Sequence, residues 1–485
     1  MHLARRLVFV SLAVTLASAC YVYRGPRNLP PIITADVLPR AAATADLDTL
    51  VAIVREVHPD PSRRLVTLRD SLAREWPDAV PRARMWRDLS QLLVTMNDGH
   101  TTLWLATEEQ QSALAAGQRV MSIGVARTAA GVVIGAVVGD DTSRVVVGEQ
   151  LLRVGGTPIE DVVRELGRAV PAELDAYRDR VVLANFGIRL WLTGARMPLP
   201  ITVANVNGVE RTVTLAGATA DDLQRQAVPR ARVAISTRRT ADSVLVVDFS
   251  TMGGDPQALH ATLDTAFVSA QLHGLRAVVV DLRRNGGGNS QQGIDMLSYV
   301  TGDPLTQGIR KEWRASTRYR QRMKAGVTPL IRWLPASWFD GSIGNFFSIP
   351  PGDVAVIPFG KPAAPPANVH RLERPLCLLM GPGTFSSAMM MANTVRQSGI
   401  GTLIGEPTGE PPNAYGEVLS FRLPHSGLAG QVSSARFILD PDSTAALRGV
   451  LPHVGVVRET ADIVAGRDPA MEIALTCGRA GGPAH

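Results

Sequence analysis

The sequence predicts a mixed α/β protein whose core sheet is partly parallel, together with an N-terminal helical domain and a small β domain. In the second half of the chain, strongly apolar runs alternate with helical segments and glycine-rich loops. That pattern is typical of strands buried on both faces of a sheet. In the first half, apolar residues first recur at the spacing of a helix and then alternate with polar residues in short segments. This order indicates helices followed by antiparallel strands.

The α/β core is predicted over residues 231–475 from three apolar runs, each followed by a helical segment. The runs are 244–249, 276–282 and 376–380, the helices are 256–273, 290–300 and 386–397, and a short fourth strand is expected at 401–405. Sites in such sheets lie at the carboxyl ends of the strands, where the glycine-rich loops 285–288 and 381–383 fall. The proline-rich stretch at about 301–372 is expected to be an irregular insertion that frames the site.

The helical domain is predicted over residues 45–115, with helices beginning at 45, 64 and 82, because apolar residues recur there at spacings of three and four. It contains the polar turn Asn97-Asp98-Gly99-His100, since Asp-Gly is a turn signal. The β domain is predicted over 116–230. It is expected to hold a hairpin at 124–138, a strand from Val145, a second strand before Gly155 and a helix over 158–166.

The composition limits the classes of function. A chain of 485 residues is expected to form two or three domains. The net charge of +6 comes almost entirely from arginine, since the only lysines are Lys311, Lys324 and Lys361. The basic residues form no block, so no nucleic-acid partner is expected. No Cys and His spacing typical of metal ligands occurs, and no cofactor is expected.

Residues 1–20 are typical of an export signal, because Arg5 and Arg6 precede an apolar run too short to span a bilayer comfortably. Ala17 and Ala19 suit ordinary signal cleavage, whereas Cys20 suits lipid attachment. A membrane anchor that is never cleaved is the third interpretation. Residues 21–44 are predicted to be a tether. The sequence therefore predicts a protein of the periplasm or cell envelope, and of the three interpretations lipid attachment at Cys20 is slightly favoured.

Two cysteines follow the signal, Cys377 and Cys477. Cys377 lies inside the apolar run 376–380. The expectation from that position is a buried free thiol.

Ser386 is the candidate nucleophile, because it lies where a buried strand turns into a helix. The first amides of that helix point towards its side chain and suit an oxyanion. The alternative is that Ser386 or Ser387 simply caps the helix, as serines often do. Glycines 286 to 288 permit close approach of backbone to a ligand. A phosphate-binding loop is one alternative there, but no Lys-Ser or Lys-Thr pair follows, so their N–H groups can instead complete an oxyanion hole with Ser387.

A nucleophilic serine needs a base. No lysine follows Lys361, and the three lysines lie in the expected irregular insertion, which makes them poor bases. Among the histidines, His100 has the most distinctive setting, a polar turn after a helix. Histidine is the common general base, although a lone loop histidine is more often solvated or structural.

Four strings of residues, in this order, resemble the tail-specific, or C-terminal processing, serine peptidases. That family includes the core of the tricorn protease and the interphotoreceptor retinoid-binding proteins. The strings are Asp98-Gly99-His100-Thr101, the segment 281–288, Thr384-Phe385-Ser386-Ser387-Ala388 and Gly405-Glu406-Pro407-Thr408-Gly409. The segment 145–166 is also similar to part of a PDZ domain, with Glu149 and Gly155 where that pattern has Asp and Asn. The resemblance covers about residues 45–475 and implies a ClpP/crotonase-like core.

The resemblance implies Ser386 as nucleophile and His100 as base, as in the tricorn-like branch. In the other branch a lysine is the base, and its place falls near Pro411 here. The chain departs from the family at Gly99, where the tricorn-like branch has a serine, and at Met389, where an acid is common. The third catalytic residue stays open among four acids, namely Asp98, Glu406, Glu410 and Glu417.

The sequence thus predicts an exported serine peptidase, which cleaves polypeptides through an acyl-enzyme intermediate. Gly286, Gly287 and Ser387 are the predicted oxyanion and substrate-binding residues. Two alternatives stay open, a non-catalytic protein on the same fold that binds a hydrophobic ligand or peptide, and an envelope scaffold that uses only its PDZ-like region. The oligomeric state is not predicted.

Overall fold

The computed structural model describes residues 36–226, 233–326, 346–479 and 482. The predicted export signal, the lipid-attachment site Cys20 and most of the predicted tether lie outside these residues. The chain divides into two compact units, each assembled from segments far apart in sequence. Unit 1 comprises Met1–Leu105, Ile309–Phe359 and Tyr415–Ile438, and unit 2 comprises Ala106–Gly308, Gly360–Ala414 and Leu439–His485.

Unit 1 combines helices with an antiparallel sheet. The helices are α2 (Arg40–Val57), α3 (Arg64–Glu75), α4 (Arg82–Val94) and α12 (Thr317–Gly326), beside the short pair β1 (Val37–Pro39) and β2 (Ala79–Pro81). The sheet has the order β14 (Val354–Pro358), β13 (Arg310–Arg314), β18 (Ala429–Ile438) and β17 (Asn413–Arg422), with β3 (Thr102–Leu103) paired to β18. The predicted apolar stripe of α2 is buried, since Leu47, Leu50 and Val54 are fully covered.

Two predictions about unit 1 are wrong. The tether was expected to reach residue 44, but β1 is already paired with β2 and α2 begins at Arg40. The helix starts there because the alanine-rich segment has high helix propensity before any apolar period appears. Lys311 does not lie in irregular structure, because it belongs to β13 and pairs with both β14 and β18. Its strand was missed because β13 is mostly charged.

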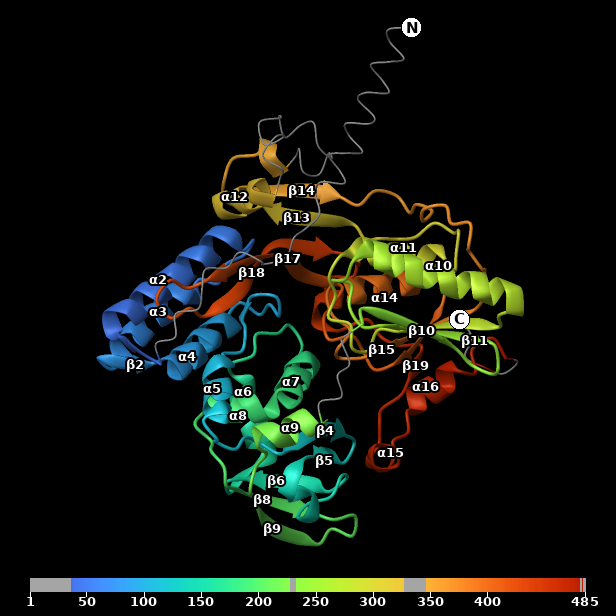
Figure 1. Ribbon diagram of the computed structural model, residues 1–485. Helices are drawn as coiled ribbons and strands as arrows, with labels where there is room; N and C mark the ends of the chain where they lie inside the picture. Colours follow the sequence, from blue (N-terminus) through green and yellow to red (C-terminus); the bar gives the residue numbers. More distant parts are fainter. Residues whose placement is uncertain (1–35, 227–232, 327–345, 480–481, 483–485) are drawn as a thin grey trace. The chain divides into compact units, whose positions relative to one another are not determined.

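The core of unit 2 is a six-stranded sheet with one antiparallel strand, so the predicted partly parallel α/β core is confirmed. The order is β10 (Ile235–Arg239), β11 (Val244–Phe249), β12 (Ala277–Asp281), β15 (Leu376–Met380), β16 (Thr402–Gly405) and β19 (Val454–Gly455), and only β10 runs antiparallel to its neighbour. Figure 1 shows α10 (Pro256–His273), α11 (Ser290–Ser298) and α14 (Ser387–Ser398) on one face and α16 (Pro469–Ala474) on the other. Both faces are therefore covered, which explains the continuous apolar runs.

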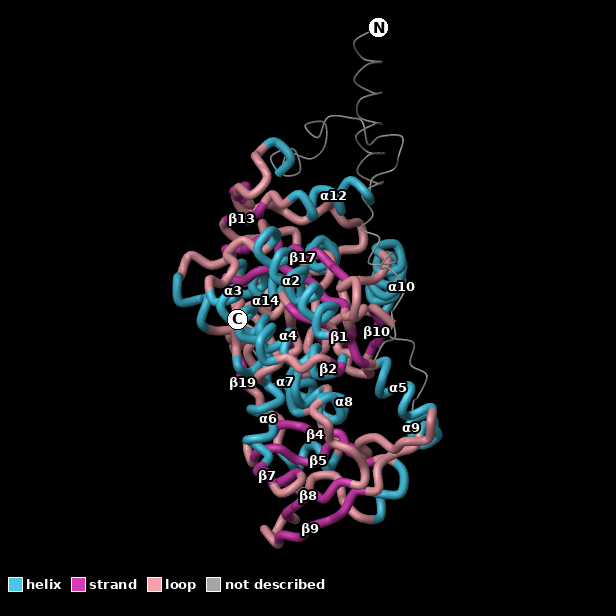
Figure 2. Tube along the Cα trace, turned by 90° about the vertical axis from the view of Figure 1, so that its left-hand side faces the viewer, coloured by secondary structure: helices cyan, strands magenta, loops and turns pink. Residues whose placement is uncertain are grey.

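Unit 2 also contains a second, antiparallel sheet with helices beside it (Figure 2). Its order is β4 (Ile123–Thr128), β5 (Gly131–Val137), β6 (Gln150–Val154), β8 (Leu199–Ala204) and β9 (Glu210–Leu215), with β7 (Thr157–Pro158) on β6. The helices α6 (Ile159–Gly167), α7 (Asp175–Ala184) and α8 (Phe186–Leu192) contribute Val162, Val182 and Phe186 to its apolar core. The remaining elements are α5 (Glu108–Ala115), α9 (Ala220–Gln226), α15 (Thr460–Ala465), η1 (Gly139–Ser143) and η4 (Ser443–Leu447).

The hairpin predicted at residues 124–138 is confirmed by the pairing of β4 with β5. The strand predicted from Val145 is wrong. The 3-10 helix η1 ends at Ser143, and Val145 follows it outside any strand and donates its N–H to the Asp141 carbonyl. Val145 is nevertheless buried, so its apolar signal reflects packing and not strand pairing.

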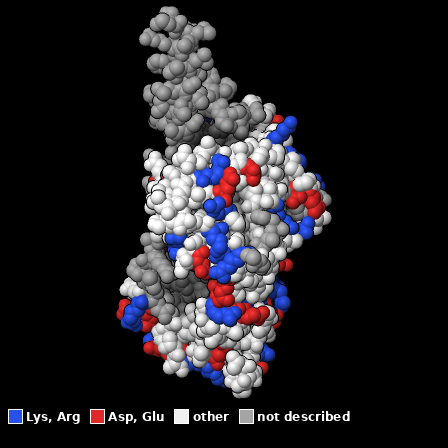
Figure 3. Space-filling view, turned by 90° about the vertical axis from the view of Figure 1, so that its right-hand side faces the viewer, with Lys and Arg blue, Asp and Glu red and all other residues white. Residues whose placement is uncertain are grey.

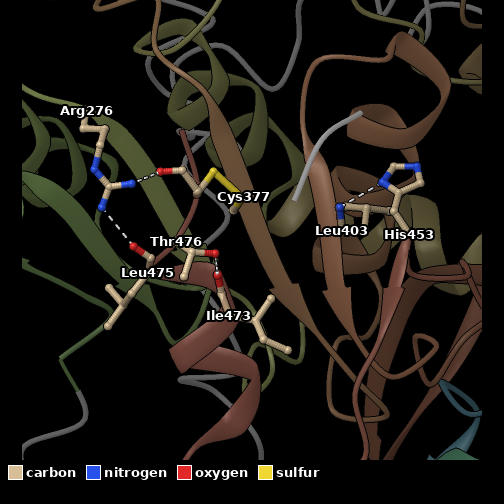
Figure 4. The surroundings of a disulfide bond; sticks show 8 residues. Arg276, Cys377, Leu403, His453, Ile473, Leu475 and Thr476 are labelled. Carbon is tan, nitrogen blue, oxygen red and sulfur yellow. Dashed lines mark hydrogen bonds between the residues drawn. A yellow bond between two sulfur atoms is a disulfide. The ribbon is translucent and has the colours of Figure 1, made fainter. Parts of the chain in front are cut away.

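The expectation of a free thiol at Cys377 is also wrong, because Cys377 and Cys477 form a disulfide (Figure 4). The burial predicted for Cys377 is confirmed. Arg276 donates hydrogen bonds to the carbonyls of Leu475 and Cys477, so the disulfide and this arginine together attach the end of the chain to the sheet. Sequence spacing did not reveal the pair, since 100 positions separate the two cysteines.

The surface carries mixed charge. Basic and acidic side chains are interspersed on the face shown in Figure 3. Within the described residues, no helix combines the length and the apolar character needed to cross a bilayer. The same part of the chain holds no group of three or more His, Cys, Asp or Glu side chains arranged to bind a metal ion.

Candidate active site

Ser386 lies between β15 and α14 in a backbone conformation that side chains rarely adopt. Its φ is 57° and its ψ is −130°, a combination that costs about 1–3 kcal/mol for a residue other than glycine. The side chain makes no capping hydrogen bond to the helix, although Ser386 is the N-cap residue. The alternative that Ser386 simply caps α14 is therefore not supported. A strained serine at the sharp turn between a strand and a helix is typical of nucleophiles in α/β hydrolases.

Asn285 connects the glycine-rich loop with the nucleophile loop. Its backbone carbonyl accepts the Phe385 N–H at 3.1 Å, and its side-chain amide donates to the Phe249 carbonyl at 2.8 Å. The side chain is fully buried, so these bonds are shielded from water. Asn285 thus fixes the two loops at neighbouring strand ends, which brings the predicted glycines next to the predicted nucleophile.

Gly287 touches Ser386 because it has no side chain. Its φ is 97°, and a Cβ added to it would lie 2.6 Å from the Ser386 Cβ. Its N–H, however, already donates to the Asn285 Oδ1 at 2.9 Å. Gly287 is therefore a contact residue of the nucleophile and a poor oxyanion donor, contrary to the prediction. Gly286 is exposed, and a Cβ added to it would meet nothing within 4 Å.

Ser387 is the first residue of α14, where helical amides lack an intrahelical acceptor. Its side chain donates to the Gly288 carbonyl at 2.7 Å, which ties the helix start to the glycine loop. Its backbone N–H therefore lies beside the nucleophile on a fixed element, as the prediction requires of an oxyanion donor.

Two of the four candidate acids belong to unit 2. The buried Glu410 accepts the Ser386 N–H at 2.6 Å, so it contacts the backbone of the nucleophile. Glu406 is only partly covered, and burial raises its pKa although the charge of Arg180 opposes this shift. Between these acids, Tyr177 of α7 stacks on Phe385 with ring centroids 4.2 Å apart.

His100 lies in unit 1, in the turn after α4, and is buried. Asp98 accepts the His100 N–H at 2.8 Å, and its Oδ1 is 4.0 Å from the His100 Nδ1. Burial alone would raise the pKa of Asp98. Hydrogen bonds from His58 and Thr101, together with the neighbouring His100, outweigh the effect of burial and lower that pKa. The predicted base therefore sits beside a buried carboxylate that is held ionised.

Glu417, the fourth candidate acid, also belongs to unit 1. Its side chain accepts from Lys311 Nζ at 3.0 Å and from the Tyr319 hydroxyl at 3.4 Å. Its φ is 53°, which is unusual for a glutamate in a strand. The Lys311 ammonium lies 3.8 Å from the centroid of the Trp313 ring as well, so this lysine is engaged in an ion pair and a cation–π contact.

The structure thus brings Ser386, Ser387, Gly286 and Gly287 together in unit 2, and it places His100 with Asp98 in unit 1. Sequence reasoning missed three contributors, Asn285, Tyr177 and His58. The Asn-Gly pair at 285–286 was a usable turn signal for the first. No local signal marks the other two, because their partners lie far along the chain.

The comparison with known families supports a serine-type peptidase. Residues 243–456 match the family model described as Peptidase family S41. This match covers less than half of the chain, and it agrees with the resemblance to the C-terminal processing serine peptidases.

Solved structures of CPAF share the fold. The crystal structure of mature CPAF matches with a TM-score of 0.61 at 15% identity, over 90% of this chain and 96% of that chain. Mature CPAF complexed with lactacystin matches with a TM-score of 0.62 at 16% identity, over 88% and 95% of the two chains. The photosystem II D1 C-terminal processing protease matches with a TM-score of 0.43 at 14% identity, over 91% and 99%. No curated protein matches the sequence.

Proposed function

We propose that this chain is an exported serine peptidase in which Ser386 attacks the peptide carbonyl and His100 is the general base. The observation that carries the proposal is the Ser386 backbone, held at a φ of 57° against Gly287 and free of a capping role. A serine kept in a costly conformation needs a reason other than helix capping, and exposure of its hydroxyl at the end of a strand supplies one.

The proposed reaction is acyl transfer to water. The Ser386 Oγ forms a bond to the carbonyl carbon while its proton passes to His100, and the N–H groups of Ser387 and Gly286 stabilise the oxyanion. Collapse breaks the C–N bond, and His100 gives its proton to the leaving amine. Water then attacks the ester with His100 again as base, which releases the acid and restores Ser386.

Export is supported by the N-terminal pattern and by the disulfide. Residues 1–20 have the charged, apolar and small-residue regions of a signal. Structural disulfides persist in oxidising compartments and are rare in the cytosol, so Cys377–Cys477 favours the periplasm or cell envelope. The lipidation of Cys20 is part of this proposal. Because β4 forms an edge of its sheet, a substrate peptide can also dock there by strand addition.

The test compares Ser386→Ala and His100→Ala with the exposed controls Ser269→Ala and His273→Ala. A fluorophosphonate should label the unsubstituted protein and both controls. Labelling should be absent in Ser386→Ala and reduced at least about 1000-fold in His100→Ala, with parallel losses in the cleavage of an unfolded protein substrate. Full activity in either site variant would overturn the assignment. A folded but unlabelled protein that binds an apolar ligand would favour the carrier alternative instead.

A further inference from the structure

A closed set of hydrogen bonds surrounds Asp98 behind His100. The carboxylate accepts from the His100 backbone at 2.8 Å through Oδ1, and from the His58 Nε2 at 3.2 Å and the Thr101 hydroxyl at 2.5 Å through Oδ2. The side chains of His58 and Asp98 are completely buried. Both carboxylate oxygens of Asp98 therefore accept hydrogen bonds, from residues that lie before and after it in the sequence.

The protonation of His58 follows from its two ring nitrogens. The Asp60 N–H donates to the His58 Nδ1 at 3.1 Å, so this nitrogen is an acceptor and carries no proton. The neutral ring therefore has its proton on Nε2, which points at Asp98. A second proton on Nδ1 would have to displace the Asp60 N–H. His58 is thus fixed as a neutral donor to Asp98.

The surroundings hold this arrangement rigidly. Thr101 donates to Asp98 and at the same time accepts the Ser433 N–H at 3.1 Å, which ties the turn to β18. The His58 ring packs on the Tyr415 ring with centroids 4.6 Å apart. Arg314, the charged group that faces His58, donates to the His58 carbonyl at 3.3 Å and not to its ring. His58, Asp98 and Thr101 are themselves completely buried.

We infer that Asp98 and His58 are positioning residues for His100, with His58 orienting Asp98 and Asp98 orienting the base. This inference rests on the proposed function of His100. Asp98 fixes the turn through the His100 N–H, and its charge lies 4.0 Å from the His100 Nδ1. An anion at that distance favours the imidazolium that forms when His100 takes the Ser386 proton. Neither Asp98 nor His58 exchanges a proton with the substrate in this proposal.

The experiment measures fluorophosphonate labelling of Ser386 against pH in the full-length protein. In Asp98→Asn, the midpoint of the profile should fall by about one pH unit, because the opposite charge beside His100 is lost. The plateau rate should fall at least about tenfold, because the turn loses its anchor. His58→Phe keeps the ring volume but removes the donor. It should also lower both the pH midpoint and the plateau rate. His58→Gln restores a donor to Asp98 and should return the plateau to within about threefold of the unsubstituted rate.

Thermal melting of each variant shows how much of it is folded. A smaller folded fraction lowers the plateau rate but does not shift the midpoint of the pH profile, so a shifted pH midpoint reports positioning and not folding. Unchanged midpoints and plateaus in Asp98→Asn and His58→Phe, alongside an inactive His100→Ala, would overturn this inference and leave the proposed function intact. Equal plateau rates in His58→Phe and His58→Gln would overturn the positioning role of His58. Full labelling of His100→Ala would instead overturn the proposed function itself.

Discussion

At the scale of single residues, three neighbours hold the backbone of Ser386 in place. Asn285 joins the glycine loop to the Phe385 backbone, and Gly287 leaves the space that the Ser386 side chain needs. Glu410 accepts the Ser386 N–H from the other side. The strained conformation of Ser386 persists because these neighbours over-determine it.

Gly287→Ala should remove activity with little change elsewhere. A Cβ there would lie 2.6 Å from the Ser386 Cβ, and the φ of 97° is unfavourable for alanine, so the loop must move. We expect a loss of fluorophosphonate labelling of at least about 100-fold and a lower melting temperature. Gly455→Ala is the matched control, since its Cβ would meet nothing within 4 Å. Wild-type labelling of Gly287→Ala would show that this contact is not needed.

Glu410→Ala should loosen the Ser386 backbone by leaving its partly buried N–H without the Glu410 acceptor, a change that costs about 1–3 kcal/mol at most. We expect a lower labelling rate and a lower free energy of unfolding in urea. Glu410→Gln keeps an acceptor oxygen in place and should retain most of both quantities. If the glutamine variant were as slow as the alanine variant, the charge and not the hydrogen bond would be the important property.

At the scale of elements, the helix α7 connects the β domain with the nucleophile loop inside unit 2. Tyr177 stacks on Phe385, and a Cβ on Gly409 would lie 2.8 Å from the Tyr177 ring. Burial, together with the charges of Glu410 and Glu173, raises the Tyr177 pKa, which keeps its hydroxyl neutral. The loop on which Ser386 lies is therefore supported by an element that is distant in sequence.

Tyr177→Ala should lower the catalytic rate more than it weakens substrate binding, because it removes the ring that supports Phe385. The same change removes the stacked ring and should lower the melting temperature. Tyr177→Phe keeps the stacked ring and should stay close to the unsubstituted protein in both kcat and melting temperature. A normal kcat in a folded Tyr177→Ala variant would contradict this role for α7.

At the scale of the whole molecule, each unit is held together by links between residues that lie far apart in the sequence. Unit 1 is assembled from three separate segments, and so is unit 2. In unit 2 the Cys377–Cys477 bond joins the central strand β15 to the end of the chain, and the bidentate pair of Arg283 with Asp468 adds a second link. Such links restrict the unfolded chain, and their effect grows with the length of the loop that they close.

Reduction should therefore destabilise the protein strongly. Closing a loop of 100 residues is worth about 4–5 kcal/mol in the chain-entropy description. We expect the Cys377→Ala, Cys477→Ala double variant, and the wild type in reductant, to unfold at clearly lower urea concentration than the oxidised protein. Thiol labelling of the unfolded, non-reduced protein is the direct check. Modification of both cysteines without reductant would show that the disulfide does not form.

The sequence by itself determined the local elements. The helix 256–273 and the strand 376–380 have the predicted bounds, and the helix predicted from residue 64 begins there, because apolar period and turn residues act within one turn or one strand. It also located Ser386 and the glycine loop at adjacent strand ends, since parallel strands share one edge for their carboxyl ends.

Tertiary structure alone decided the partners. His58 meets Asp98 across 40 positions, Ser386 meets Glu410 across 24, and Cys377 meets Cys477 across 100. It also changed Gly287 from an expected oxyanion donor into a contact residue, because the Asn285 side chain takes its N–H. Local propensity cannot specify such pairs. They arise from the packing of whole elements, whose contacts are set by the burial of faces and not by the residues next to them in the chain.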